Sequence, residues 1–122
     1  MSYDFMMMKP KPERETEIES LEDLGEHTLL RQEPAALIEG LSSLFPEIEW
    51  RKEEAGGWFG ALKGDDSWYE FRIEAAPDVS WSIRTSHRAG PHNLVPKICD
   101  TLGLLAFDGQ ANLLIWPAAP GA

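Results

Sequence analysis

The alternation of apolar and polar side chains between residues 68 and 85 predicts two neighbouring strands. The apolar positions are Tyr69, Phe71 and Ile73 in the first run and Val79, Trp81 and Ile83 in the second, with charged residues or serine between most of them. A period of two means that each strand has one apolar face and one polar face. The short segment 75–78 contains Pro77 and Asp78, so the two runs are expected to form an antiparallel hairpin.

Apolar residues at helical spacing predict two helices. The first covers 33–44, begins near Pro34, and has the apolar stripe Leu37, Ile38, Leu41, Leu44 and Phe45. Gly40 lies within this stripe and is expected to permit close packing against the sheet. The second helix starts with Asn93 as its N-cap and ends at Gly103, with the stripe Leu94, Val95, Ile98 and Leu102.

The remaining apolar runs are short and are separated by turn residues, as in strands. Asp108-Gly109 between the last two runs predicts a hairpin. The expected strands beyond the first hairpin are 2–8, 48–51, 58–62, 104–107 and 112–116. Runs of strands with helices at intervals predict an α+β fold, with a mostly antiparallel sheet of about five to seven strands and two main helices packed on one face.

A chain of 122 residues is the right length for one domain with a single hydrophobic core. We expect this α+β domain to cover 1–117, with a tail at 118–122. The segment 11–27 differs in composition because acidic residues dominate it. Thr16 and Glu19 form a capping-box pattern, so the segment is predicted to be either a short helix or a disordered acidic loop.

The formal net charge of −10 restricts the classes of partner. A negative surface repels the phosphates of nucleic acids and the headgroups of anionic membranes. Neither nucleic acid nor a membrane surface is therefore expected as a partner. A basic protein fits the charge, and solubility alone would also account for it.

The single cysteine, Cys99, excludes an internal disulfide bond and fits a reducing compartment. Its place in the apolar stripe of the second helix favours a small buried side chain over a nucleophile. The N-terminal residues lack the pattern of a secretory signal, and no apolar run has the length of a bilayer span. These features predict a cytoplasmic protein.

The polar face of the 68–85 hairpin is the strongest candidate binding surface. Pairing Phe71 with Trp81 would place Trp68 opposite Arg84, where the two could form a cation–π contact. The candidate residues are Trp68, Glu70, Arg72 and Arg84. Tryptophan and arginine are enriched in binding hot spots. A purely structural role for Trp68, packed under the 86–92 loop, remains the alternative.

Two further groups of residues complete the candidates. The acidic residues Glu17, Glu19, Glu22 and Asp23 could attract a basic protein. His87, Arg88 and His92, in the loop 86–92, would be the site if the protein were an enzyme or a small-ligand binder. Their spacing does not match a zinc site, and no phosphate loop or dinucleotide motif is present. We therefore predict no catalytic residue, no metal and no cofactor.

Short motifs at both ends resemble those of a group of small, uncharacterised bacterial proteins. The N-terminal motif is Met1-Ser2-Tyr3-Asp4-Phe5, and the C-terminal motif is Gly103-Leu104 followed by Phe107-Asp108-Gly109-Gln110. Trp68-Tyr69-Glu70-Phe71 is similar as well, whereas the acidic segment has no counterpart. Ala111 stands where the group often has glycine. Some members are similar to immunity or interaction proteins, so the resemblance implies a binding module, in its sharpest form an immunity-type inhibitor.

Overall fold

The structure, a computed structural model, describes residues 2–10, 29–64, 67–86 and 93–116. Eight strands and two helices follow one another along these residues. They are β1 (Tyr3–Pro10), β2 (Leu29–Leu30), α1 (Pro34–Leu44), β3 (Glu49–Lys52), β4 (Trp58–Lys63), β5 (Trp68–Ile73), β6 (Ser80–Thr85), α2 (Val95–Leu102), β7 (Leu105–Asp108) and β8 (Leu113–Ile115). The predicted α+β class and the two main helices are confirmed.

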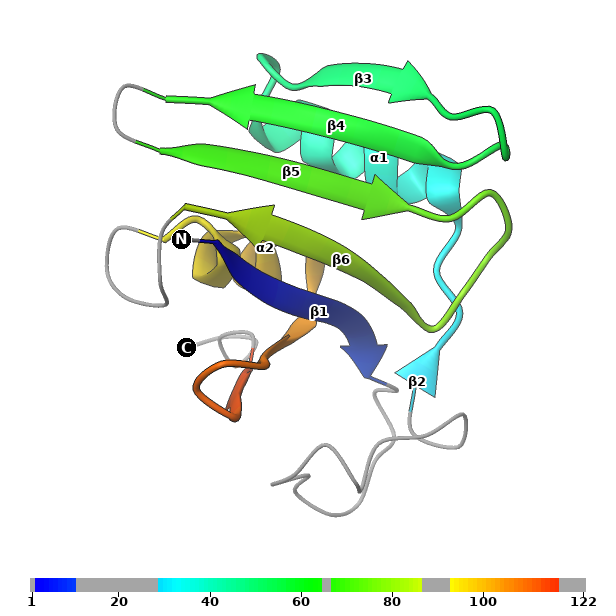
Figure 1. The fold of residues 1–122 in the computed structure, drawn as a ribbon. Coiled ribbons are helices and arrows are strands. Elements are labelled where there is room, and N and C mark those ends of the chain that lie inside the picture. Colours follow the sequence, from blue (N-terminus) through cyan, green and yellow to red (C-terminus); the bar gives the residue numbers. More distant parts are fainter. Residues whose placement is uncertain (1, 11–28, 65–66, 87–92, 117–122) are drawn as a thin grey trace.

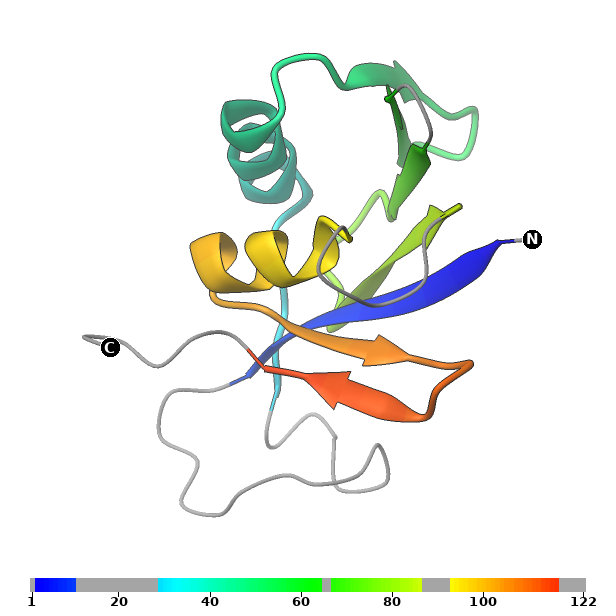
Figure 2. The same cartoon turned by 90° about the vertical axis from the view of Figure 1, so that its left-hand side faces the viewer.

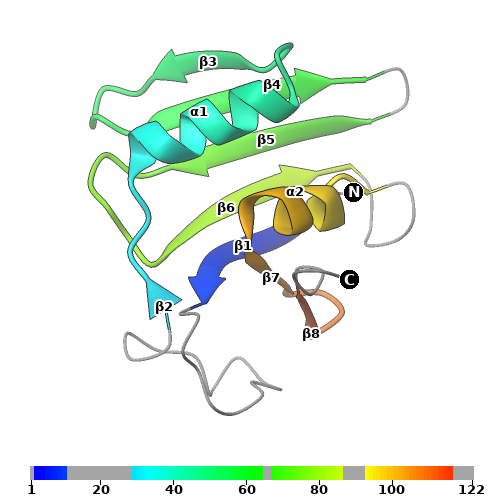
Figure 3. The same ribbon diagram turned by 180° about the vertical axis from the view of Figure 1, so that it is seen from behind.

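The strands form an antiparallel sheet in the order β3-β4-β5-β6-β1-β7-β8. The short strand β2 is not part of this order; it pairs with Lys9 and Pro10 at the end of β1. The N-terminal strand β1 therefore lies inside the sheet, between β6 and β7 (Figure 1). Both helices lie on the same face of the sheet. Figure 2 views the molecule from the side and shows both helices on one side of the strands. Figure 3 shows α1 over β4 and β5, and α2 over β6 and β1.

The main core lies between the sheet and the helices. Phe71, Ile83 and Leu41 are fully buried there, and Trp81 and Ile98 join them as predicted. Leu102, also expected in the buried stripe, is only partly buried and packs against this core. A Cβ on Gly40 would lie 2.9 Å from Leu102 Cδ2. Gly40 thus permits close approach of α2 rather than of the sheet, which corrects the expected packing.

The predicted strands are present, with two differences at the N-terminal strand. β1 continues through Lys9 and Pro10 instead of ending before them, and β2 pairs with this extension. Pro10 is tolerated because it is the last residue of the strand, where the missing N–H disturbs the hydrogen bonds between strands least. β2 was not predicted, because a strand of two residues has no detectable alternation.

The second helix ends at the predicted Gly103, but its N-cap is Leu94 rather than the predicted Asn93, which lies one residue earlier. Asn93 Oδ1 accepts a hydrogen bond of 2.8 Å from the backbone N–H of Val95, which satisfies one of the unpaired donors at the helix N-terminus. The hydroxyl of Tyr69 accepts a second bond, 3.1 Å, from the N–H of Leu94. Gly103 has a φ of 66°, in the left-handed region that ends many helices.

The hairpin predicted from Asp108-Gly109 is present as β7 and β8. Four residues, 109–112, connect the strands, and the left-handed residue is Asn112, with a φ of 52°. The buried Asp108 carboxylate accepts hydrogen bonds from the N–H groups of Gln110 and Ala111 at 3.1 and 3.3 Å. Aspartate therefore organises this loop through its side chain, as in an Asx turn.

Gln32 connects the segment before α1 to the centre of the sheet. Its side-chain oxygen accepts a 2.9 Å hydrogen bond from Trp81 Nε1, and its side-chain nitrogen donates to the carbonyl oxygens of Met7 and Val79. The residue is buried, so these bonds compensate for the loss of water. The path from β2 to α1 is held in place by this polar contact.

Candidate functional site

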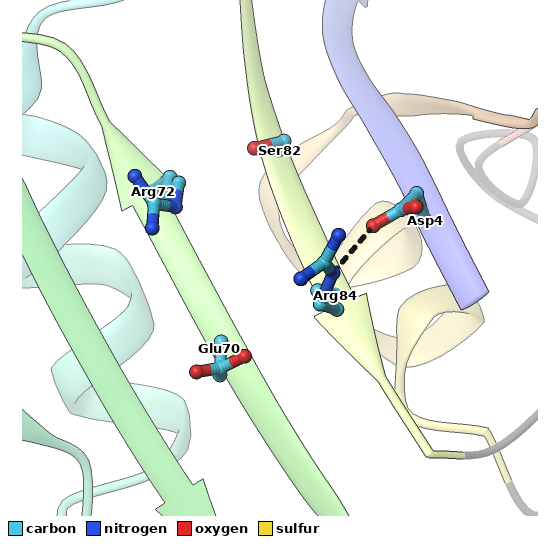
Figure 4. A pocket seen from close by; sticks show the side chains of 5 residues that line it. All are labelled: Asp4, Glu70, Arg72, Ser82 and Arg84. Carbon is cyan, nitrogen blue, oxygen red and sulfur yellow. Dashed lines mark hydrogen bonds and ion pairs between the residues drawn. The ribbon is translucent and has the colours of Figure 1, made fainter. Parts of the chain in front are cut away.

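The face of the sheet opposite the helices has a charged depression in its middle. It has a volume of about 240 Å³ and is lined by Asp4, Glu70, Arg72, Ser82 and Arg84. These residues come from three adjacent strands, β1, β5 and β6, and their side chains share one face because they alternate with buried residues (Figure 4). Three of the four predicted hairpin residues, Glu70, Arg72 and Arg84, thus lie together.

The register of the strands places charges of alternating sign side by side. Glu70 lies directly opposite Arg84, and Arg84 lies directly opposite Asp4. Arg84 turns to Asp4, with 3.1 Å between Nε and Oδ1 (Figure 4). The two side chains are 57% and 64% exposed, so the ion pair contributes only about 0–1 kcal/mol to stability. Its main consequence is that the Arg84 Nε–H donates to Asp4, and the described residues form no ion pair between Arg84 and Glu70.

Glu70 is half-buried in the depression. Among the described residues, no Lys or Arg nitrogen lies within ion-pair distance of its carboxylate. A carboxylate in this position can accept hydrogen bonds from a cationic group that enters from solvent.

Arg72 makes a different contact, with an aromatic ring. Its guanidinium carbon lies 5.6 Å from the centre of the Phe59 ring, and that of Arg51 lies 4.6 Å from the same centre. The three residues occupy one row across β3, β4 and β5. Cation–π contacts at exposed sites contribute about 0.5–1 kcal/mol each and restrict the arginine side chain. The ring therefore contacts Arg72 beside the depression, which Arg72 lines.

The open face changes character from one side of the sheet to the other. Along a single row, charged and aromatic residues on β3–β5 give way to apolar residues on β1, β7 and β8: Arg51, Phe59, Arg72, Ser82, Met6, Phe107 and Leu114. Met6 is 40% exposed at the boundary. Beside the charged depression, Met6 is thus exposed, whereas Phe107 and Leu114 are partly buried against a second cluster formed by Met8, Leu29 and Leu105.

The structure corrects the register predicted for the hairpin. Phe71 pairs with Ile83, not with Trp81, so Glu70 rather than Trp68 lies opposite Arg84. Trp68 lies at the level of Ser86, whose hydroxyl accepts a 3.0 Å hydrogen bond from the Trp68 N–H. A shift of two residues keeps each side chain on its face, which is why the predicted polar face is still correct. The described residues form no cation–π contact between Trp68 and Arg84, because Arg84 contacts Asp4.

The other candidates lie outside the described residues. They are Glu17, Glu19, Glu22 and Asp23 of the acidic segment, and His87, Arg88 and His92 of the alternative site. Among the residues that the structure describes, no three His, Cys, Asp or Glu side chains gather as metal ligands would. Neither described helix is long and apolar enough to cross a membrane.

Sequence reasoning missed Asp4 and Ser82 as members of the depression, and it missed the contacts of Phe59 with Arg72 and Arg51. Asp4 alternates with apolar neighbours in β1, which was a detectable signal. Its pairing with Arg84, however, joins residues 80 positions apart in the sequence. A contact of that separation depends on which strands become neighbours, and strand order does not follow from alternation.

Cys99 has the environment of a structural thiol. It is fully buried in the main core, and this burial, helped by the negative charge of Asp100, raises the pKa of the thiol from 9.0 to about 12. The thiolate is the reactive form of cysteine, and it is scarce in such a site at neutral pH. The prediction of a small buried side chain is confirmed.

This environment predicts an alkaline loss of stability. The unfolded chain releases the Cys99 proton near its ordinary pKa, whereas the folded chain retains it up to about pH 12. The protonated Cys99 thiol therefore makes its full contribution to the free energy of unfolding below about pH 9. This contribution declines as the pH rises toward 12. We expect Cys99→Ala to show a smaller decline in the free energy of unfolding over this range than the native chain. Equal declines, measured by urea unfolding, would contradict the assignment.

Comparisons of the chain with protein-family models, with curated proteins and with solved structures find no match. The functional argument therefore depends on the geometry of the open face and on the sequence itself.

Proposed function

We propose that the chain is a non-enzymatic protein-binding module, and that its binding surface is the open face of the sheet around Glu70, Arg72 and Arg84. The observation that carries this proposal is the charged depression on a sheet face that the two helices leave uncovered. Arg72, which lines the depression, contacts the Phe59 ring on one side of it, and the exposed Met6 lies on the other side. This combination is typical of surfaces that bind proteins.

An enzymatic role for the same depression has less support. Acid–base or nucleophilic catalysis requires a titratable or nucleophilic group aligned with a second group that activates it. In the depression, Asp4 is paired with Arg84, and both are largely exposed to water. The alternative of an enzyme or small-ligand site in the 86–92 loop rests on His87, Arg88 and His92, which lie outside the described residues.

The partner that fits best is a basic protein. The net charge of −10 favours encounter with a positively charged surface, and the Glu70 carboxylate can pair with a cationic side chain there. The resemblance to immunity-type proteins supports an inhibitor of a basic partner as the sharpest form of the proposal. A cytoplasmic location is part of this proposal, supported by the single cysteine.

The proposal is tested by capturing partners on the immobilised chain and measuring the dissociation constant of each one identified. Glu70→Gln should weaken binding by about tenfold or more, because it leaves the partner's cationic group desolvated without its counter-charge. Glu39→Gln makes the same chemical change at an exposed position on α1, on the helical side, and should leave the dissociation constant unchanged. Equal effects of the two substitutions would show that the open face is not the binding surface.

A further inference from the structure

Strand β5 presents two opposite charges on the open face that do not pair with each other. Glu70 and Arg72 are separated by one residue, which places them about 7 Å apart along the strand. The described residues provide Glu70 with no cationic partner and Arg72 with no carboxylate partner. Figure 4 shows the two side chains lying apart on the strand.

The contact of Arg72 with Phe59 explains why it does not reach Glu70. Its guanidinium lies over the aromatic ring, on the side of β4. A cation–π contact does not use the N–H groups of a guanidinium in hydrogen bonds to a carboxylate, so these groups stay available as donors. Arg72 thus contacts the ring through an interaction that leaves its charge and its N–H donors available.

Arg84 would be the natural partner of Glu70, since the two lie opposite each other on β5 and β6. It is instead held by Asp4 at 3.1 Å, on the far side from β5. The opposite charges of Arg84 and Asp4 therefore compensate each other, whereas the two charges on β5 do not. The two charges that remain without a charged partner among the described residues are the Glu70 carboxylate and the Arg72 guanidinium.

We infer that the partner presents a cationic and an acidic side chain two residues apart on an extended segment, which lies along β5. In an extended chain, side chains of one face repeat at the same distance of about 7 Å as Glu70 and Arg72. A basic residue then pairs with Glu70 while an acidic residue accepts hydrogen bonds from Arg72. This inference rests on the proposed function and adds the charge pattern that the site recognises.

The test uses three synthetic peptides of equal length whose central residues are Arg-Thr-Asp, Arg-Thr-Arg or Asp-Thr-Asp, in the same threonine- and serine-rich flanks. Each is titrated into the ¹⁵N-labelled full chain at low ionic strength, and the amide shifts of β5 and β6 are followed by NMR. We expect the Arg-Thr-Asp peptide to bind about two- to fivefold more tightly than either other peptide, which is the range for exposed ion pairs. The net charge of the chain alone would favour Arg-Thr-Arg.

The variant Glu70→Arg makes both β5 positions cationic and should change the preference to Asp-Thr-Asp. Glu39→Arg changes the net charge equally but lies on α1, so it should keep the native order of affinities. Tightest binding of Arg-Thr-Arg to the native chain would overturn the charge pattern while leaving capture of a basic partner intact. Unshifted β5 amides with all three peptides would also overturn it. Failure of the partner-capture experiment is a separate result and would reject the proposed function itself.

Discussion

Replacing Phe71 with alanine should lower the free energy of unfolding by about 3–5 kcal/mol, which is a large part of the stability of a domain of this size. Phe71 is fully buried in the main core and lies between Gly60 and Ile83 on the neighbouring strands. The Trp50 ring packs near it, with 6.1 Å between the ring centres. Truncation would leave a cavity that the rigid sheet cannot close. Chemical unfolding followed by tryptophan fluorescence measures the change.

Phe59→Ala is the matched control for this substitution. Phe59 lies on the adjacent strand but on the open face, where it is half-buried between two arginines. This substitution should lower the free energy of unfolding much less than Phe71→Ala does. It removes a half-buried ring and two exposed cation–π contacts of about 0.5–1 kcal/mol each. A Phe71→Ala chain that unfolds cooperatively at the native midpoint would show that the two faces of the sheet have been interchanged.

The sequence predicted which face of a strand is buried more reliably than it predicted how the strands pair. Alternation depends only on nearby residues, so the buried positions of β5 and β6 and the polar positions opposite them follow directly from it. The register of this hairpin was wrong by two residues, because 75–78 suggested a shorter connection than the one that forms. Since side chains repeat every two residues, that error moved Trp68 away from Arg84 without moving either side chain to the other face.

The position of β1 in the middle of the sheet could not be predicted in the same way. Its pairing with β6 brings Asp4 beside Arg84, and Asp4 accepts a hydrogen bond from the Arg84 Nε–H. Gly60 is a similar case within a strand. A Cβ on it would lie 2.7 Å from the Trp50 ring, so the glycine makes room for that side chain. Neither role is visible until the strand order is known.

The second large effect is expected when the charges of the acidic segment are reversed. The quantity that should change is the rate of association with a basic partner. Reversing Glu17, Glu19, Glu22 and Asp23 to lysine changes the formal charge of the chain from −10 to −2, because each substitution adds two positive charges. Electrostatic attraction accelerates encounter between oppositely charged proteins by tenfold or more at low salt. We therefore expect the reversed chain to associate about tenfold more slowly. Surface plasmon resonance with the captured partner measures both rate constants.

Salt provides an independent check on the same attraction. Raising the ionic strength from about 0.01 to 0.1 M shortens the screening distance from about 30 to 10 Å, so the association rate of the native chain should fall toward that of the reversed chain. Glu70→Gln should behave differently, because Glu70 acts inside the formed complex and its loss accelerates dissociation. A thermal melt of each variant controls for folding. If the reversed chain associates at the native rate, the acidic segment does not attract the partner, and binding depends on the open face alone.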